Sequence, residues 1–99
     1  MLFEVICVII YLQYIGGNME TRAAVIAIIV RDNESSRQIN TILHEYNDAI
    51  IGRMGIPYRQ KGISIISVAV DARQDVINSL AGRIGRISGV TAKTVYSPV

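Results

Sequence analysis

From residue 23 onwards, short apolar runs alternate with segments in which apolar residues recur every three or four positions. The runs over residues 23–30 (AAVIAIIV) and 63–70 (ISIISVAV) are rich in β-branched residues and predict buried strands. Residues 49–56 (AIIGRMGI) predict a strand between these two, and residues 57–62 the loop that follows it. Residues 90–96 (VTAKTVY) predict a fourth and last strand.

Two helices are predicted in the gaps between these strands. Ser35 is followed three residues later by Gln38, and Asp71 by Gln74, so we expect each helix to begin with a capping box. Apolar residues at helical spacing then form one face of each helix. They are Ile39, Ile42, Leu43 and Tyr46 in the first helix, and Val76, Ile77, Leu80, Ala81, Ile84 and Ile87 in the second.

Three glycines lie in or after the second helix. Gly82 and Gly85 fall inside the helical pattern, where each costs about 1 kcal/mol relative to alanine. We expect the helix to approach a neighbouring backbone closely at these positions, and a local weakness on the solvent side is the alternative. Gly89 fits the position just after the helix end, which favours a left-handed conformation.

The elements follow one another in the order βαββαβ. Two β-α-β units with right-handed crossovers give a four-stranded antiparallel sheet with both helices on one face. The predicted fold class for residues 19–99 is therefore α+β, a ferredoxin-like sandwich that forms one domain.

The first strand is apolar on both of its sides. Alternate positions place Ala24, Ile26, Ile28 and Val30 on one side, and Ala23, Val25, Ala27 and Ile29 on the other. The helices cover only one face of such a sheet, so a monomer would expose the other apolar face to water. We expect a homo-oligomer, either a dimer or a tetramer, and a cover formed by residues 1–15 is the alternative.

Residues 1–18 form an apolar extension ahead of this domain. The stretch MLFEVICVIIYLQYI lacks the basic start of a secretory signal, and Glu4 and Gln13 interrupt it as a membrane span, so no membrane association is predicted. Met19 follows two glycines and an asparagine. We expect Met19 to be the true start of the protein, and an extra strand or helix that covers an apolar face is the alternative.

The composition restricts the class of protein. The chain of 99 residues is 51% hydrophobic and 18% charged, which is typical of a folded domain. Its net charge of +2 is small and the basic residues are scattered, so direct binding to nucleic acid is not expected. Cys7 is the only cysteine, which excludes an intrachain disulfide and fits a reducing cytoplasm.

Several segments point to a known family. They are AVIAIIV (residues 24–30), ILHEYNDAIIGRMGIPYR (42–59) and GISIISVAVDA (62–72), of which IIGRMGIPYR is the most specific. On these segments, residues 20–99 resemble the small regulators assigned to the iron-only hydrogenase system, which are ACT-like domains related to the ligand-binding half of the nickel-responsive repressor. The resemblance implies a ferredoxin-like fold, self-association and a regulatory role.

The resemblance does not extend to the repressor's nickel site. The positions that align with the repressor's strand histidines are Met54 and Ile56, and its cysteine falls near Gly62 or Ile63. None of these residues offers a nitrogen or thiolate ligand, and His44 alone does not make a site. We therefore predict no metal site and no cofactor, and the repressor's DNA-binding half is missing.

One candidate ligand-binding segment lies between the first strand and the first helix. It contains Asp32, Asn33 and Ser35. ACT-like domains hold ligands against this loop at a subunit interface, and the free N–H groups of a helix N-terminus can receive an anion. The alternative is that these residues only cap the helix.

The second candidate segment contains Arg53, Met54, Gly55 and Tyr58. A charge in the middle of an apolar strand needs a partner or a route to water. We expect Arg53 to pair with an acid across an interface or to bind an anionic ligand, and a solvent-exposed position on an edge strand is the alternative. His44 is expected to be a surface histidine near a helix end, with a ligand or switch role as the alternative.

The sequence contains no recognisable catalytic constellation of residues, neither a Ser-His-acid set nor a glycine-rich phosphate loop. We therefore expect a non-enzymatic, oligomeric domain that senses a ligand or regulates a hydrogenase system through a partner protein. A purely structural interaction module and a small enzyme with its site between subunits are the alternatives.

Overall fold

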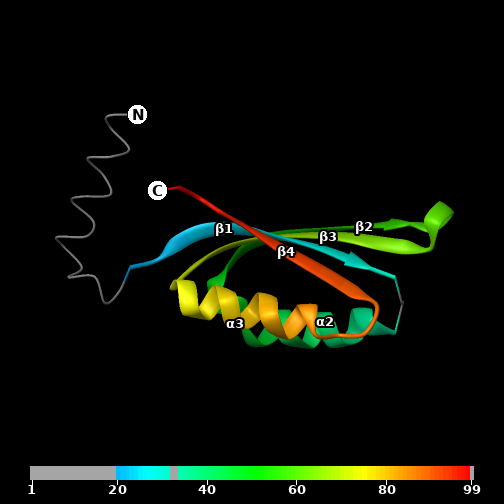
Figure 1. Ribbon diagram of the computed structural model, residues 1–99, viewed down its shortest axis with the longest axis horizontal. Helices are drawn as coiled ribbons and strands as arrows, with labels where there is room; N and C mark the ends of the chain where they lie inside the picture. Colours follow the sequence, from blue (N-terminus) through cyan, green and yellow to red (C-terminus); the bar gives the residue numbers. More distant parts are fainter. Residues whose placement is uncertain (1–19, 32–33, 99) are drawn as a thin grey trace.

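Two α-helices pack on one face of a four-stranded sheet in the computed structural model, which describes residues 20–31 and 34–98 (Figure 1). The elements in chain order are β1 (Arg22–Val30), α2 (Ser35–Glu45), the 3-10 turn η1 (Asn47–Ala49), β2 (Ile50–Tyr58), the 3-10 turn η2 (Arg59–Lys61), β3 (Ile63–Ala72), α3 (Gln74–Gly85) and β4 (Val90–Tyr96). The predictions for residues 1–18, including the start at Met19, lie outside the described residues.

The sheet has the strand order β2-β3-β1-β4, and all neighbouring strands are antiparallel. The two strands with the most β-branched residues, β1 and β3, lie in the centre, and β2 and β4 form the edges. This topology confirms the predicted α+β class and the ferredoxin-like fold.

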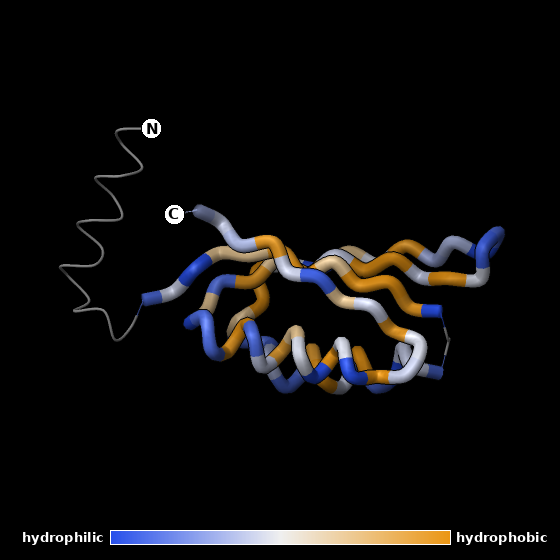
Figure 2. Tube along the Cα trace, in the orientation of Figure 1, coloured by the Kyte–Doolittle hydropathy of each residue, from blue (hydrophilic) through white to orange (hydrophobic). Residues whose placement is uncertain are grey.

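The core lies between the sheet and the helices. Alternate residues of β1 are buried because they face the helices, and Ile26 and Ile28 are fully inaccessible to water. The predicted apolar stripes of α2 and α3 pack against them. Figure 2 shows apolar segments, coloured orange, in both helices and in the strands. The fully buried residues of the helices are Ile39, Leu43, Ile77, Leu80 and Ile84.

Neither helix begins with the capping box that the sequence predicted. The residue before α2 is Glu34 and the residue before α3 is Arg73, and neither makes a side-chain capping bond. Asp71 belongs to β3, which runs two residues longer than predicted, so its side chain cannot cap α3. Tertiary pairing with β1 extends the strand past the local capping signal.

The glycines of α3 do not mark a close backbone approach. A β-carbon added to Gly82 would lie 3.9 Å from the end of the Arg86 side chain, and one at Gly85 would lie 3.9 Å from the β-carbon of Ala92. Both distances are ordinary van der Waals contacts, so the prediction of a tight backbone contact is wrong. Gly89 has a φ of 78°, which confirms the left-handed conformation predicted there.

The β2–β3 hairpin extends beyond the end of the helix layer to the turn η2 (Figure 1). Every residue from Ile51 to Gly62 is exposed. The pairing with β3 is regular except at one place, where Ile50 lies opposite Val70 and Gly52 lies opposite Ala69. Ile51 is therefore an extra residue, as in a β-bulge.

Candidate functional site

The predicted residues of β2 lie on two different faces of the sheet. Arg53 lies opposite Val68, a fully buried residue of the core, and is therefore on the face that carries the helices. Met54 lies opposite Ser67 and points away from the helices. Alternation along the strand then places Gly55 with Arg53, and Tyr58 with Met54. The four residues do not form one site.

Arg53 borders a pocket between α2 and the start of β2. Its guanidinium donates a hydrogen bond of 2.7 Å from Nη2 to Oδ1 of Asn40 on α2. The pocket has a volume of about 410 Å³, which is within the range of small-molecule sites. Its walls are formed by Asn40, Leu43, His44, Asn47, Ile50, Ile51, Gly52 and Arg53.

Sequence reasoning found Arg53 but not most of the other residues of this pocket. Asn40, His44 and Asn47 follow one another at spacings of four and three residues, so they lie on one side of α2 and its end. That polar stripe next to the apolar stripe was the available signal. His44 is exposed and borders the pocket, which fits both the surface position and the ligand role considered for it.

Ser35 has a structural contact rather than a free hydroxyl. The residue is buried, and its Oγ donates a hydrogen bond of 2.9 Å to the backbone carbonyl of Ser88, in the connection between α3 and β4. This bond ties the start of α2 to the turn that precedes β4. Asp32 and Asn33, the other two candidates of that loop, lie outside the described residues.

The sheet surface that points away from the helices, which we call the open face, is largely apolar. Its exposed apolar side chains include Val25 on β1, Ile65 on β3 and Val95 on β4, the last with an exposed fraction of 68%. Pairing places the following residues on the open face: Ala23, Val25, Ala27, Ile29, Met54, Ile56, Tyr58, Ile63, Ile65, Ser67, Ala69, Asp71, Thr91, Lys93 and Val95. Nothing among the described residues covers it.

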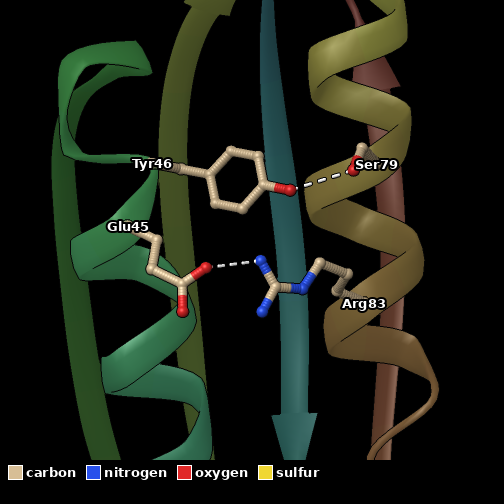
Figure 3. A network of polar contacts seen from close by, with 4 residues as sticks. All are labelled: Glu45, Tyr46, Ser79 and Arg83. Carbon is tan, nitrogen blue, oxygen red and sulfur yellow. Dashed lines mark hydrogen bonds and ion pairs between the residues drawn. The ribbon is translucent and has the colours of Figure 1, made fainter.

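A polar network joins the two helices on the opposite side of the molecule. Figure 3 shows Glu45 and Tyr46 of the α2 end reaching Arg83 and Ser79 of α3, with the sheet behind them. Oε2 of Glu45 accepts a hydrogen bond of 2.6 Å from Nη1 of Arg83, and the hydroxyls of Tyr46 and Ser79 share one of 2.9 Å. The guanidinium of Arg83 also lies 5.6 Å from the ring centroid of Tyr46.

These contacts shift the titration of three groups. The hydrogen bond from Arg83, and then its charge, lower the pKa of Glu45. Hydrogen bonds to Ser79 and Arg83 lower the pKa of Tyr46, and Glu45 in turn raises the pKa of Arg83. Glu45 is exposed, and Tyr46 and Arg83 are half-buried, so the network links the two helices at the surface of the molecule.

Within residues 20–31 and 34–98, no three His, Cys, Asp or Glu side chains are grouped so that they could hold a metal ion. In the same part of the chain, no helix has the length and apolarity needed to cross a membrane.

Comparison with known proteins identifies the family. A family model named TM1266-like, with the description "Iron-only hydrogenase system regulator, putative", matches residues 22–94. The solved structure of uncharacterized protein TM1266 from Thermotoga maritima is similar to this chain, with a TM-score of 0.75 and 36% sequence identity. The similarity covers 78% of this chain and 98% of that one. No curated protein matches the chain. The resemblance seen in the sequence is thus confirmed, and the chain belongs to the TM1266-like family.

Proposed function

We propose that this protein is a non-catalytic regulatory domain of an iron-only hydrogenase system, which works as a homo-oligomer and responds to a small ligand. The observation that carries the proposal is the apolar open face. The exposed fractions of Val25 and Met54 on this face are 42% and 60%. An apolar patch that runs across several strands usually marks an association surface.

A second copy of the chain fits this surface. In a two-fold dimer the same patch lies on both partners, so a face that is apolar in its centre is complementary to itself. The open face also carries Asp71 on β3 and Lys93 on β4, which have no ion-pair partner among the described residues. Opposite charges on one face allow each copy to pair its lysine with the aspartate of the other copy.

The regulatory part of the proposal draws on the family and on the pocket beside Arg53. A regulator of this kind binds a signal molecule and transmits the effect to a partner protein. The pocket has room for a small molecule, and the oligomer presents a surface to which a partner protein can bind. We place this activity in the cytoplasm, as expected from the cysteine usage of the sequence.

The molecular mass in solution tests the assembly. We expect light scattering on the full chain to give a mass of at least two chains across the micromolar range. Val25→Glu introduces a charge on the open face and should shift the mass toward one chain, with an unchanged circular dichroism spectrum. Gln38→Glu adds the same charge to the exposed side of α2 and should leave the mass unchanged. A single-chain mass for the parent protein contradicts the proposal.

Thermal stability separates a ligand-responsive regulator from a purely structural interaction module. A ligand that binds only the native state raises the melting temperature. We expect at least one class of metabolite to stabilise the parent protein in a screen. An oligomer that no metabolite stabilises would favour the structural module.

A further inference from the structure

The polar side chains that line the pocket between α2 and β2 are basic or neutral. They are one guanidinium (Arg53), one imidazole (His44) and two carboxamides (Asn40 and Asn47). No carboxylate of the described residues borders it. The pocket therefore has several hydrogen-bond donors, at least one full positive charge and, among the residues that the structure describes, no competing carboxylate.

Arg53 has donors left for a ligand. Its only hydrogen bond within the described residues goes to Asn40, a neutral acceptor, and the ion pairs of that part of the chain involve Arg73 and Arg83 instead. A guanidinium carries five N–H groups in a planar fork, and the bond to Asn40 uses one of them. The bond holds the fork at the pocket wall without neutralising its charge.

One feature of the pocket opposes an anion. His44 lies in the last turn of α2, where the backbone carbonyls carry a negative partial charge of about half a unit. The full charge of Arg53 exceeds this partial charge. The nearby carboxylate of Glu45 points to Arg83 on α3, and Asp48 does not border the pocket. The balance of charge at the wall therefore favours an anion.

The rest of the wall is apolar and leaves room for part of a ligand. Leu43 and Ile50 line the side next to the core, and Ile51 lines the outer side. Gly52 has no side chain, so it contributes only backbone to the wall beside the strand. A ligand that fills this pocket has a charged end and a short apolar end.

We infer that this pocket binds a small oxyanion, a carboxylate or a phosphate, attached to a short apolar group. The free N–H groups of Arg53 bind the oxyanion, and the carboxamides of Asn40 and Asn47 and the ring of His44 orient it. The apolar group lies against Leu43 and Ile51. This inference names the ligand class for the ligand response proposed above and rests on that proposal for its regulatory meaning.

Two probes separate the charge from the apolar contact. Inorganic phosphate tests the oxyanion alone, and isovalerate tests a carboxylate with a short branched group. Each is titrated into the full, isotope-labelled protein while NMR follows the His44 ring and the side-chain amides of Asn40 and Asn47. We expect saturable shifts at these three residues, with isovalerate binding more tightly than phosphate because it also contacts the apolar wall.

A matched pair of variants tests the role of Arg53. Arg53→Met removes the charge but keeps an apolar stem, and we expect it to weaken binding of both probes by about tenfold or more. Arg59→Met removes the same charge from η2, outside the pocket, and should leave binding unchanged. Equal losses in the two variants, or the absence of saturable shifts at His44 and both amides, would overturn the inference.

The oligomer mass of each sample keeps the two proposals separate. An oligomeric parent protein that binds neither probe refutes the anion site and leaves the assembly standing. A single-chain mass together with Arg53-dependent binding refutes the assembly and leaves the anion site standing.

Discussion

Arg53 Nη2 and Asn40 Oδ1 form a hydrogen bond of 2.7 Å that joins the edge strand β2 to α2. The strand supplies a charge, and the helix supplies a neutral acceptor. Because both side chains are exposed, the bond competes with water and contributes little to folding. Its role is to set the direction of the guanidinium at the pocket wall.

The stability of Arg53 variants follows from this arrangement. We expect Arg53→Ala and Arg53→Met to change the free energy of unfolding by no more than about 0.5 kcal/mol, because the side chain is exposed and lies outside the core. Urea denaturation of both variants at equal protein concentration measures the change. A loss of several kcal/mol in either variant would mean that Arg53 is buried in a contact that forms in the native oligomer.

The hydroxyl of Ser35 should matter for folding. Ser35→Ala removes the hydrogen bond to the Ser88 carbonyl from a buried position, and we expect a loss of about 1 kcal/mol. Ser36→Ala is the control, because its side chain makes no hydrogen bond within the described residues and should change stability by less than about 0.5 kcal/mol. Similar values for the two variants would show that the Ser35–Ser88 bond does not stabilise the fold.

Alanine substitutions at two glycines near the end of α3 should change the stability of the protein in opposite directions. Gly82→Ala should stabilise the protein by up to about 1 kcal/mol, because the added methyl group meets only the flexible end of Arg86. Gly89→Ala should destabilise it, because a φ of 78° strains a residue with a β-carbon. Thermal unfolding of both variants gives the signs. A destabilising Gly82→Ala would indicate a contact on that side of α3 that forms only in the oligomer.

The Glu45–Arg83 pair makes a small, acid-sensitive contribution to stability. Since the native state lowers the pKa of Glu45, the contribution is present above the carboxyl's ordinary pKa of 4.5 and is lost as the pH falls through the lower native value. The melting temperature of the parent protein should therefore exceed that of Glu45→Gln at neutral pH, and the difference should close in acid.

A second carboxylate provides the control for this pH dependence. Asp48→Asn removes an exposed carboxylate that has no ion-pair partner in the described part of the chain. Its melting temperature should follow that of the parent protein as the pH falls. A difference between parent and Glu45→Gln that persists in acid would show that the side chain acts through packing rather than charge.

The periodicity of the sequence was enough to predict the layers of this fold. The apolar runs of β1 and β3 identify the central strands, and the residues that α2 and α3 bury are those at helical spacing. The capping boxes were predicted wrongly. Ser35 bonds to Ser88, a residue 53 positions away, rather than to its own helix, and Asp71 remains part of β3. A local capping pattern carries no information on such a partner.

Only part of the candidate site could be predicted from the sequence. Arg53 stood out because a charge interrupts an apolar strand. Alternation along the strand separates Arg53 from Met54, but which of the two faces the helices depends on how β2 pairs with β3. The spacing of Asn40, His44 and Asn47 marks a polar side of α2, but polar residues on a helix surface are common and do not by themselves indicate a site. Their meaning comes from the position of β2 beside α2, which only the folded chain defines.

The extra residue Ile51 lengthens β2 by one residue without shifting its later pairing with β3. Deleting Ile51 would restore one-to-one pairing after Ile50 and would leave every later side chain of the strand opposite its present partner. Arg53 would stay opposite Val68 on the helix side, and Met54 would stay opposite Ser67 on the open face. The deletion would also remove one apolar wall of the pocket, because Ile51 lines it. Loss of this one codon would therefore impair ligand recognition and spare assembly, which separates the two surfaces genetically.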